Sequence, residues 1–168
     1  MSRSPTSLGG WHARLLLALG LTLAFLVPLM AARVVENARV RSWERMGFAP
    51  EQTRQWWSGG FSRQAEAIRW RANGFGPEAA AAWRTMEFIP QDAKEWIEAG
   101  FNLPAAVDWR TYAFEPTAAQ HWRDAGFGVG DAVVWRKHAF GPAEAKRWKA
   151  TGRSPLEAAD RKRAGGVP

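Results

Sequence analysis

A repeated aromatic pattern constrains this chain more than any other feature. Phenylalanine recurs with a 13-residue period from residue 48 onward, interrupted by one 14-residue step. A tryptophan follows most of these phenylalanines by eight positions, and a small residue precedes each of those tryptophans by three. The phenylalanines are Phe48, Phe61, Phe75, Phe88, Phe101, Phe114, Phe127 and Phe140. Such regularity predicts a tandem repeat in which every unit adopts the same short structure.

Prolines and glycines indicate that each unit is a short helix followed by a turn. In one continuous helix, each 13-residue step would turn successive tryptophans roughly 140° away from a common face. Prolines lie two positions after the phenylalanine position, where a first helical turn tolerates them, and glycines lie just before it, where helices end. They are Pro50, Pro77, Pro90, Pro116, Pro142 and Pro155, with Gly47, Gly60, Gly74, Gly100, Gly126 and Gly152. We therefore expect helices of about nine or ten residues, each followed by a tight turn that carries the phenylalanine.

The small residue and the tryptophan are predicted to form the buried face of each helix. At positions i and i+3 they share one face, and the phenylalanine can fold back over the helix end as part of a capping motif. Regular tryptophans can also stack on sugars, nucleobases or peptides, but no other large apolar residue recurs to build a core. The predicted core is Trp56, Trp70, Trp83, Trp96, Trp109, Trp122, Trp135 and Trp148, with Phe75, Phe88, Phe101, Phe114, Phe127 and Phe140.

A second, 26-residue period is superimposed on the first. Alternate units end in glycine, while the units between them end in Glu87, Ala113 or Ala139. The units without glycine are also the more apolar ones, with Val107, Val133 and Val134. We expect two unlike helices to form a hairpin, with the apolar helix lying inward and the hairpins stacking into a short α-solenoid.

Irregular units are expected at both ends of the array. Residues 33–47 read as a linker helix that doubles as the N-terminal cap, and residues 48–152 hold the regular repeats. In residues 153–168, Arg153 and Arg161 replace the phenylalanine and the tryptophan, which predicts a C-terminal cap with a basic tail. Within the array, Ser62, Asn102 and Asp131 are candidate N-caps.

The N-terminal region predicts a membrane anchor. Residues 1–14 form a basic flank with no acidic residue, and residues 15–32 carry no charge. Eighteen helical residues span roughly 27 Å, about the thickness of the hydrocarbon core. A cleaved secretory signal is the alternative, although the run is long for one and residues 28–32 offer no small-x-small cleavage site. We favour an uncleaved signal anchor, within which Pro28 would kink the helix or lie near its end.

The flanking charges conflict over the orientation of this single-pass segment. Arg33, Arg39, Arg41 and Arg45 favour a cytoplasmic C-terminal side by the positive-inside rule. A short basic N-terminus that stays inside would instead send the repeats outward. The balance slightly favours an exported array, periplasmic or extracellular, and the cytoplasmic side stays open.

Charge is concentrated at the ends of the chain. The chain carries 23 basic and 16 acidic residues, a net charge of +7. Residues 33–146 contribute only +1, whereas residues 147–168 contribute +4. Nucleic-acid binding requires a basic surface along the contacting face, which a nearly neutral array does not provide. We therefore expect no nucleic-acid partner.

One local row of arginines is a candidate partner-binding surface. Arg84, Arg110 and Arg136 each follow a tryptophan and recur with the 26-residue period. In stacked hairpins they would line one face and could bind an acidic segment through paired hydrogen bonds. The alternative is a solvated face with arginine stems lying over tryptophan. If the row binds a partner, its replacement by glutamate should weaken binding and leave helicity intact.

No catalytic, cofactor or metal site is predicted. The chain has no cysteine, and His12, His121 and His138 share neither a ligand spacing nor a recurring carboxylate. It also lacks a phosphate loop, a nucleophile elbow and a paired-carboxylate signature. We therefore expect a protein that is not an enzyme.

The sequence as a whole predicts a membrane-anchored helical-repeat protein. Its expected role is a non-catalytic interaction or assembly module for a protein partner associated with the membrane. One alternative is a structural accessory subunit of a larger membrane complex. Another is an exported soluble binder of peptide or carbohydrate, if the N-terminus is cleaved.

Overall fold

A computed structural model describes residues 9–168, with the backbone alone for residues 9–25. It contains two compact units, Met1–Ser58 and Gly59–Pro168. All regular secondary structure in the described residues is helical, which confirms the all-α prediction. The first unit holds α1 (Gly9–Arg45) and α2 (Pro50–Ser58). The second holds α3 (Gln64–Ala72), α4 (Pro77–Thr85), α5 (Pro90–Glu98), α6 (Leu103–Thr111), α7 (Pro116–Asp124), α8 (Val129–Lys137), α9 (Pro142–Ala150) and α10 (Pro155–Arg163).

The first unit consists of a long helix and one short helix. Helix α1 runs for 37 residues and continues through Pro28, so the predicted helical linker over residues 33–47 is an extension of the same helix up to Arg45. The chain then turns, and Trp43 meets Phe48 edge to face with ring centres 5.0 Å apart. Trp43 and Phe48 are both buried. The aromatic pairing of the repeats therefore begins at the end of α1.

No helix among the described residues is both long enough and apolar enough to cross a membrane. The predicted membrane segment, residues 15–32, lies largely outside the part of the chain whose side chains are described.

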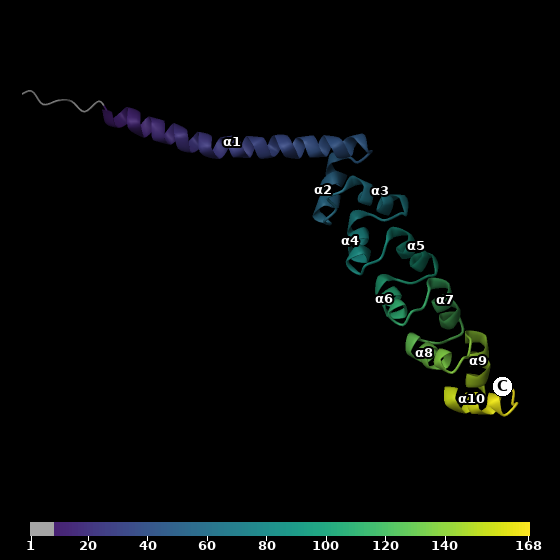
Figure 1. Ribbon diagram of the computed structural model, residues 1–168. Helices are drawn as coiled ribbons and strands as arrows, with labels where there is room; N and C mark the ends of the chain where they lie inside the picture. Colours follow the sequence, from purple (N-terminus) through teal and green to yellow (C-terminus); the bar gives the residue numbers. More distant parts are fainter. Residues whose placement is uncertain (1–8) are drawn as a thin grey trace, which may run out of the picture. The chain divides into compact units, whose positions relative to one another are not determined.

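The second unit is the helical repeat that the sequence predicts. Each of its helices is nine residues long, within the expected range. Figure 1 shows α4, α6 and α8 along one side of this unit and α3, α5, α7 and α9 along the other. The 13-residue period is one helix with its turn, and the 26-residue period returns the chain to the same side.

Helix starts rely mainly on proline and an extended preceding residue, with few side-chain caps. Asn102 is an N-cap as predicted, because its side-chain oxygen accepts a hydrogen bond from the Ala105 N–H at 3.0 Å. The predictions for Ser62 and Asp131 are wrong. The extra residue of the 14-residue step places Arg63, not Ser62, immediately before α3, and Asp131 is already the third residue of α8.

The helix ends explain why phenylalanine follows tryptophan by five positions. The Phe114 N–H donates to the Trp109 carbonyl at 3.2 Å, and the Ala113 N–H donates to the Arg110 carbonyl at 2.9 Å. This pair of bonds is the Schellman motif, which brings an apolar residue beyond the helix back onto the last turn. The Trp109 and Phe114 rings accordingly meet edge to face at 4.9 Å. The predicted return of phenylalanine over the helix end is confirmed.

The residue before each phenylalanine adopts a left-handed backbone in both kinds of 13-residue repeat, those that end in glycine and those that do not. Gly100 and Gly126 have φ of 81° and 88°, a region that glycine enters freely. Glu87, Ala113 and Ala139 have φ of 55° to 63°, where an L side chain costs roughly 1–2 kcal/mol. The alternation seen in the sequence is therefore a difference in backbone strain at equivalent positions.

Exchanging alanine and glycine at two of these positions should change stability in opposite directions. We expect Ala113→Gly to raise the free energy of unfolding by about 0.5–1 kcal/mol, because relief of strain exceeds the extra chain entropy of glycine. Gly126→Ala should lower it by about 1 kcal/mol, since an added Cβ meets nothing within 4 Å and introduces backbone strain alone. Urea denaturation measures both changes, and a shift of the same sign in both variants would contradict this explanation.

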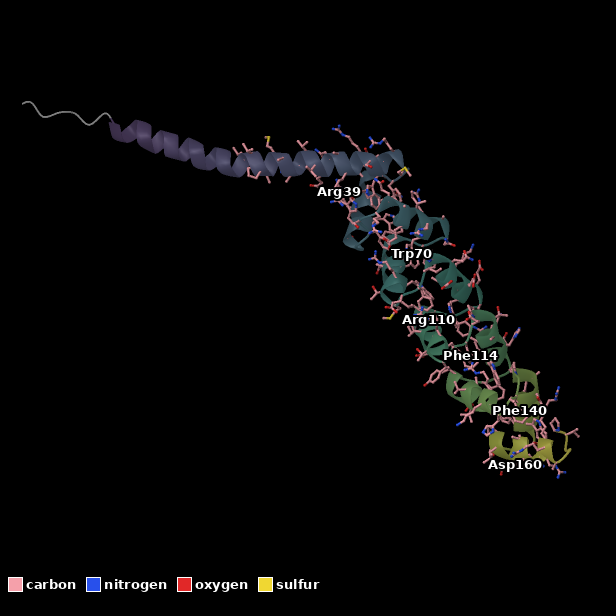
Figure 2. The ribbon with its side chains drawn as sticks, viewed as in Figure 1. Arg39, Trp70, Arg110, Phe114, Phe140 and Asp160 are labelled. Atoms are coloured by element: carbon pink, nitrogen blue, oxygen red, sulfur yellow. The ribbon has the colours of Figure 1, made fainter. Side chains whose placement is uncertain are left out.

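The core consists of one small residue and one tryptophan per helix, sealed by the phenylalanines. The small residues that precede the core tryptophans have no exposed surface, and every tryptophan and phenylalanine of the predicted core is at most 6% exposed. Trp70, Phe114 and Phe140 are labelled among the side chains in Figure 2. Both kinds of helix bury the same two positions, so neither lies inward of the other. Val107 and Val133 are only half-buried and Val134 is 46% exposed, so the expectation of an inner apolar helix is wrong.

Candidate functional site

Arg110 shows how the arginine after each tryptophan is held. Its guanidinium carbon lies 3.6 Å from the centre of the Phe88 ring. Its Nη1 donates to the Glu87 carbonyl at 3.3 Å, and its Nη2 donates to the Met86 carbonyl. These carbonyls follow the end of α4, where backbone oxygens have no donor within the helix. One side chain thus covers the capping phenylalanine and satisfies the helix end beneath it.

The same arrangement recurs at three other arginines, with donor–acceptor distances between 2.6 and 3.2 Å. Each guanidinium stacks on a phenylalanine and donates to the two carbonyls that precede it. The sets are Arg84 with Phe61, Gly59 and Gly60; Arg123 with Phe101, Ala99 and Gly100; and Arg136 with Phe114, Tyr112 and Ala113. Arg123 and Arg136 therefore join α7 and α8 to the ends of the helices two places earlier, α5 and α6, and Arg84 joins α4 to the turn at residues 59–61.

The predicted arginine row is part of a longer series that follows the 13-residue period. Lys149 lies 4.8 Å from the Phe127 ring centre, and Lys162 lies 5.0 Å from that of Phe140. We call Arg84, Arg110, Arg123, Arg136, Lys149 and Lys162 the cation row. Sequence reasoning missed half of it because it compared only alternate units. The signal was present, since a basic residue follows the tryptophan position in most units, with Ile97 an exception.

Acidic residues near helix starts pair with members of the cation row. Arg84 contacts Glu66 at 3.4 Å, Lys149 contacts Asp131 at 3.3 Å, and Lys162 contacts Glu144 at 2.8 Å. Each acid is the third residue of the helix that precedes the cation, where the helix dipole favours negative charge. These partly exposed pairs contribute little stability individually. They do show that these cations contact an acidic side chain as well as a phenylalanine ring within the array.

These contacts indicate a structural role for Arg84, Arg110 and Arg136. Their guanidinium donors are directed at backbone carbonyls and their faces lie on phenylalanine rings. An acidic partner would have to compete with these internal acceptors. Arg84, Arg110 and Arg136 therefore stabilise contacts within the array. Their role in binding a partner stays a prediction.

Other side chains on the second unit remain open to solvent. Met86 and Tyr112 are 44% and 49% exposed. They occupy equivalent places in alternate 13-residue repeats, each two positions before the phenylalanine. A groove of about 640 Å³ also opens on this unit, and Arg63, Arg69 and Ile89 are among its lining residues. The groove offers mixed charge and apolar surface, without a convergent set of catalytic groups.

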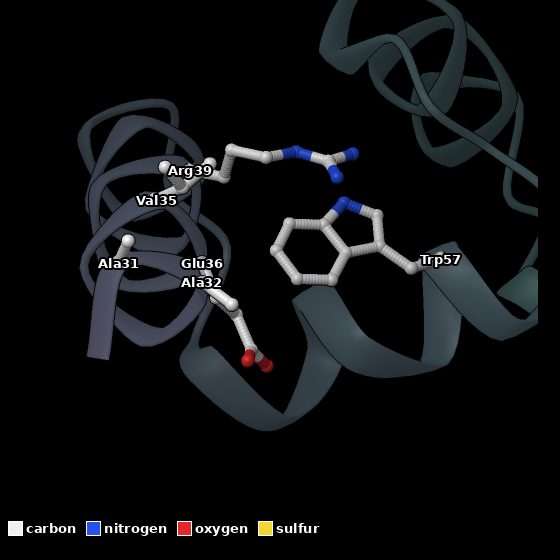
Figure 3. A pocket seen from close by; sticks show the side chains of 6 residues that line it. All are labelled: Ala31, Ala32, Val35, Glu36, Arg39 and Trp57. Carbon is white, nitrogen blue, oxygen red and sulfur yellow. The ribbon is translucent and has the colours of Figure 1, made fainter. Parts of the chain in front are cut away.

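A second hollow lies in the first unit, between α1 and α2. We call it the notch; it has a volume of about 540 Å³ and is lined by Ala31, Ala32, Val35, Glu36, Arg39 and Trp57. Figure 3 shows the side chains that line it. Trp57 stands at the position that carries a cation in most later units, and here the cation comes instead from α1. The Arg39 guanidinium carbon lies 4.6 Å from the Trp57 ring centre.

The titratable groups of the described residues do not assemble into a reactive centre. No group of three or more His, Asp or Glu side chains among them could hold a metal ion. Hydrogen bonds from Ser154, first from its hydroxyl and then from its backbone N–H, lower the pKa of Glu157. These bonds form the capping box that starts α10, so the shift reflects helix capping.

Comparison with protein-family models, curated proteins and solved structures gives no match. The function must therefore be inferred from the chain itself.

Proposed function

We propose that this protein is a membrane-anchored helical-repeat protein that presents a non-catalytic binding surface to a protein partner. The observation that supports it best is the character of α1 where its side chains are described. Leu26, Val27, Leu29, Met30, Val34 and Val35 are each 50% to 68% exposed. Large contiguous apolar surface of this kind usually contacts lipid or another protein.

The anchor of this proposal is the uncharged stretch of residues 15–32. The same helix, α1, extends beyond it to Arg45, so a single element would carry the chain from the bilayer to the first aromatic cap. A helix rises by a fixed length of about 1.5 Å per residue. The repeats would thus begin at a defined distance from the lipid surface.

Fractionation of the full-length chain tests the anchor. We expect the protein to remain with membranes after alkaline or high-salt washing, because residues 15–32 would be inserted in the hydrocarbon core. Leu23→Arg combined with Leu26→Arg should release it, since each central arginine opposes insertion by about 2.5–3.5 kcal/mol. Leu156→Arg is the matched control, an exposed leucine of α10 that should leave fractionation unchanged.

Two results would contradict the anchor. Release of the unmodified protein by alkaline washing would show that it is only peripherally bound. A mature chain that begins near residues 31–33 would show that a signal peptide is cleaved, which favours the exported soluble binder.

We place the partner surface on the edge that carries Met86 and Tyr112. Their exposed side chains recur at the 26-residue interval, beside the carbonyls that Arg110 and Arg136 hold in position. A partner that runs along the array would meet equivalent positions in successive repeats. A photo-crosslinker at position 112 should capture it more efficiently than one at Glu95, an exposed position on α5. Equal capture at both positions would count against this edge.

The accessory-subunit alternative differs in stoichiometry. Purification in a mild detergent would then yield one partner at a fixed ratio, even from cells in which the protein is overproduced with that partner. A substoichiometric or exchangeable partner supports the interaction module instead.

A further inference from the structure

The notch between α1 and α2 places a buried hydrogen-bond donor that has no acceptor close to an arginine. The Trp57 Nε1 is buried and has no hydrogen-bond partner. The Arg39 guanidinium reaches from α1 over the Trp57 ring, and Figure 3 shows it beside the indole nitrogen, so that a second donor group lies close to the first. Two converging N–H donors are complementary to an anionic oxygen, and a buried donor without an acceptor is unfavourable.

The rest of the notch has a different character. Ala31, Ala32 and Val35 supply an apolar wall on α1, at the end of the uncharged run and just beyond it. Glu36 extends from the same helix to a separate place in the notch (Figure 3). Its carboxylate would repel a simple anion but attract a cationic group. Arg39 and Glu36 are three positions apart, about 4.5 Å along the helix axis.

We infer that this notch binds the headgroup of a zwitterionic phospholipid, an inference that rests on the membrane anchoring proposed above. The phosphate accepts hydrogen bonds from Trp57 Nε1 and from the Arg39 guanidinium. The ammonium group, joined to the phosphate by a two-carbon linker, pairs with Glu36. The lipid's apolar part lies against Ala31, Ala32 and Val35, directed toward the uncharged run.

The location of the notch agrees with this ligand. Arg39 lies seven positions beyond Ala32, about 10 Å along α1 from the end of the uncharged segment. Tryptophan and arginine side chains are favoured at this depth, where an apolar body and a polar group are both accommodated. A headgroup bound there would also link α1 to α2, because Arg39 and Trp57 belong to different helices.

The test uses the full-length chain, labelled with ¹⁵N and held in a maltoside detergent that carries neither phosphate nor charge. Dihexanoylphosphatidylethanolamine is titrated, and the indole N–H resonance of Trp57, assigned by its loss in Trp57→Phe, is followed. We expect a saturable shift of this resonance. Arg39→Gln should raise the Kd about tenfold, because a charge-assisted hydrogen bond to phosphate is lost.

Matched variants and ligands separate this inference from its rivals. Arg41→Gln removes the same charge from α1 at a residue that does not line the notch, and it should leave the Kd unchanged. Dihexanoylphosphatidylglycerol, which lacks the ammonium group, should bind more weakly than the ethanolamine lipid, and Glu36→Gln should remove that preference. Inorganic phosphate should cause no saturable shift.

Several outcomes would overturn the inference. They are an unmoved Trp57 resonance, an equal effect of Arg39→Gln and Arg41→Gln, or binding of inorganic phosphate as tight as that of the lipid, which would indicate a site for free phosphate. The anchor is judged separately by fractionation, which Arg39→Gln should not alter. Normal fractionation without lipid binding would reject the notch alone, and loss of membrane association in the unmodified chain would reject the anchor.

Discussion

Replacement of Trp109 by alanine is expected to lower the free energy of unfolding by about 3–5 kcal/mol. Trp109 is 6% exposed and meets Phe101 at 6.1 Å and Phe114 at 4.9 Å between ring centres. Its removal would leave a large cavity at the centre of the array and would expose the phenylalanine that caps α6. Trp122→Ala, in the next helix, should have a similar effect.

Arg161→Ala is the matched control, because Arg161 occupies the tryptophan position of α10 but is exposed. We expect a change within about 0.5 kcal/mol there. Chemical denaturation followed by circular dichroism measures all three variants. Tryptophan emission of the unmodified protein should also be blue-shifted, since the repeat indoles are shielded from water. Red-shifted emission together with neutral tryptophan variants would mean that these residues are exposed ligand contacts.

Charge reversal of Arg84, Arg110 and Arg136 together is expected to lower the free energy of unfolding by about 3 kcal/mol, or about 1 kcal/mol per site. Each substitution removes hydrogen bonds to two backbone carbonyls and the stacking on a phenylalanine. It also places a carboxylate beside the negative end of a helix. The sites lie in separate repeats, so their effects should add approximately.

This expectation differs from the one drawn from the sequence, in which the triple change would weaken partner binding and leave helicity intact. The physical reason is that the guanidiniums stabilise helix ends inside the array. Lys137, Lys146 and Arg147, changed to glutamate, are the control, because they are exposed, lie outside the cation row and alter net charge equally. Residues 161–163 would be a poorer choice, since Lys162 contacts Phe140 and Glu144. Equal thermal stability of the two triple variants would show that the arginine contacts add nothing.

The repeat itself was predictable because its rules are local. Proline at a helix start, glycine at a helix end and tryptophan three positions after alanine all act within a single repeat unit. Asn102 as an N-cap followed from the same reasoning, and so did the fold-back of phenylalanine onto the last helical turn. At the 14-residue step, one inserted residue moves the start of the helix by one position, so the prediction of Ser62 as N-cap is wrong.

The functional surfaces could not be read in this way, because they depend on which units become neighbours. Arg110 acts on the end of α4, at positions 86 and 87, so its role is visible only when α4 and α6 lie on the same side of the array. The notch likewise depends on Arg39 of α1 meeting Trp57 of α2, two residues that lie on different helices separated by a turn. No spacing rule within one unit connects either pair.

The sequence by itself determined the all-helical class, the helix length and the identity of the buried aromatic residues. Each of these depends on backbone preferences and on the burial of one face, which are written within a single unit. The tertiary structure alone decided that alternate helices bury equivalent positions, leaving Val134 exposed. It also decided that the arginines after tryptophan hold helix ends together, because a guanidinium binds whichever carbonyls the packing brings within reach.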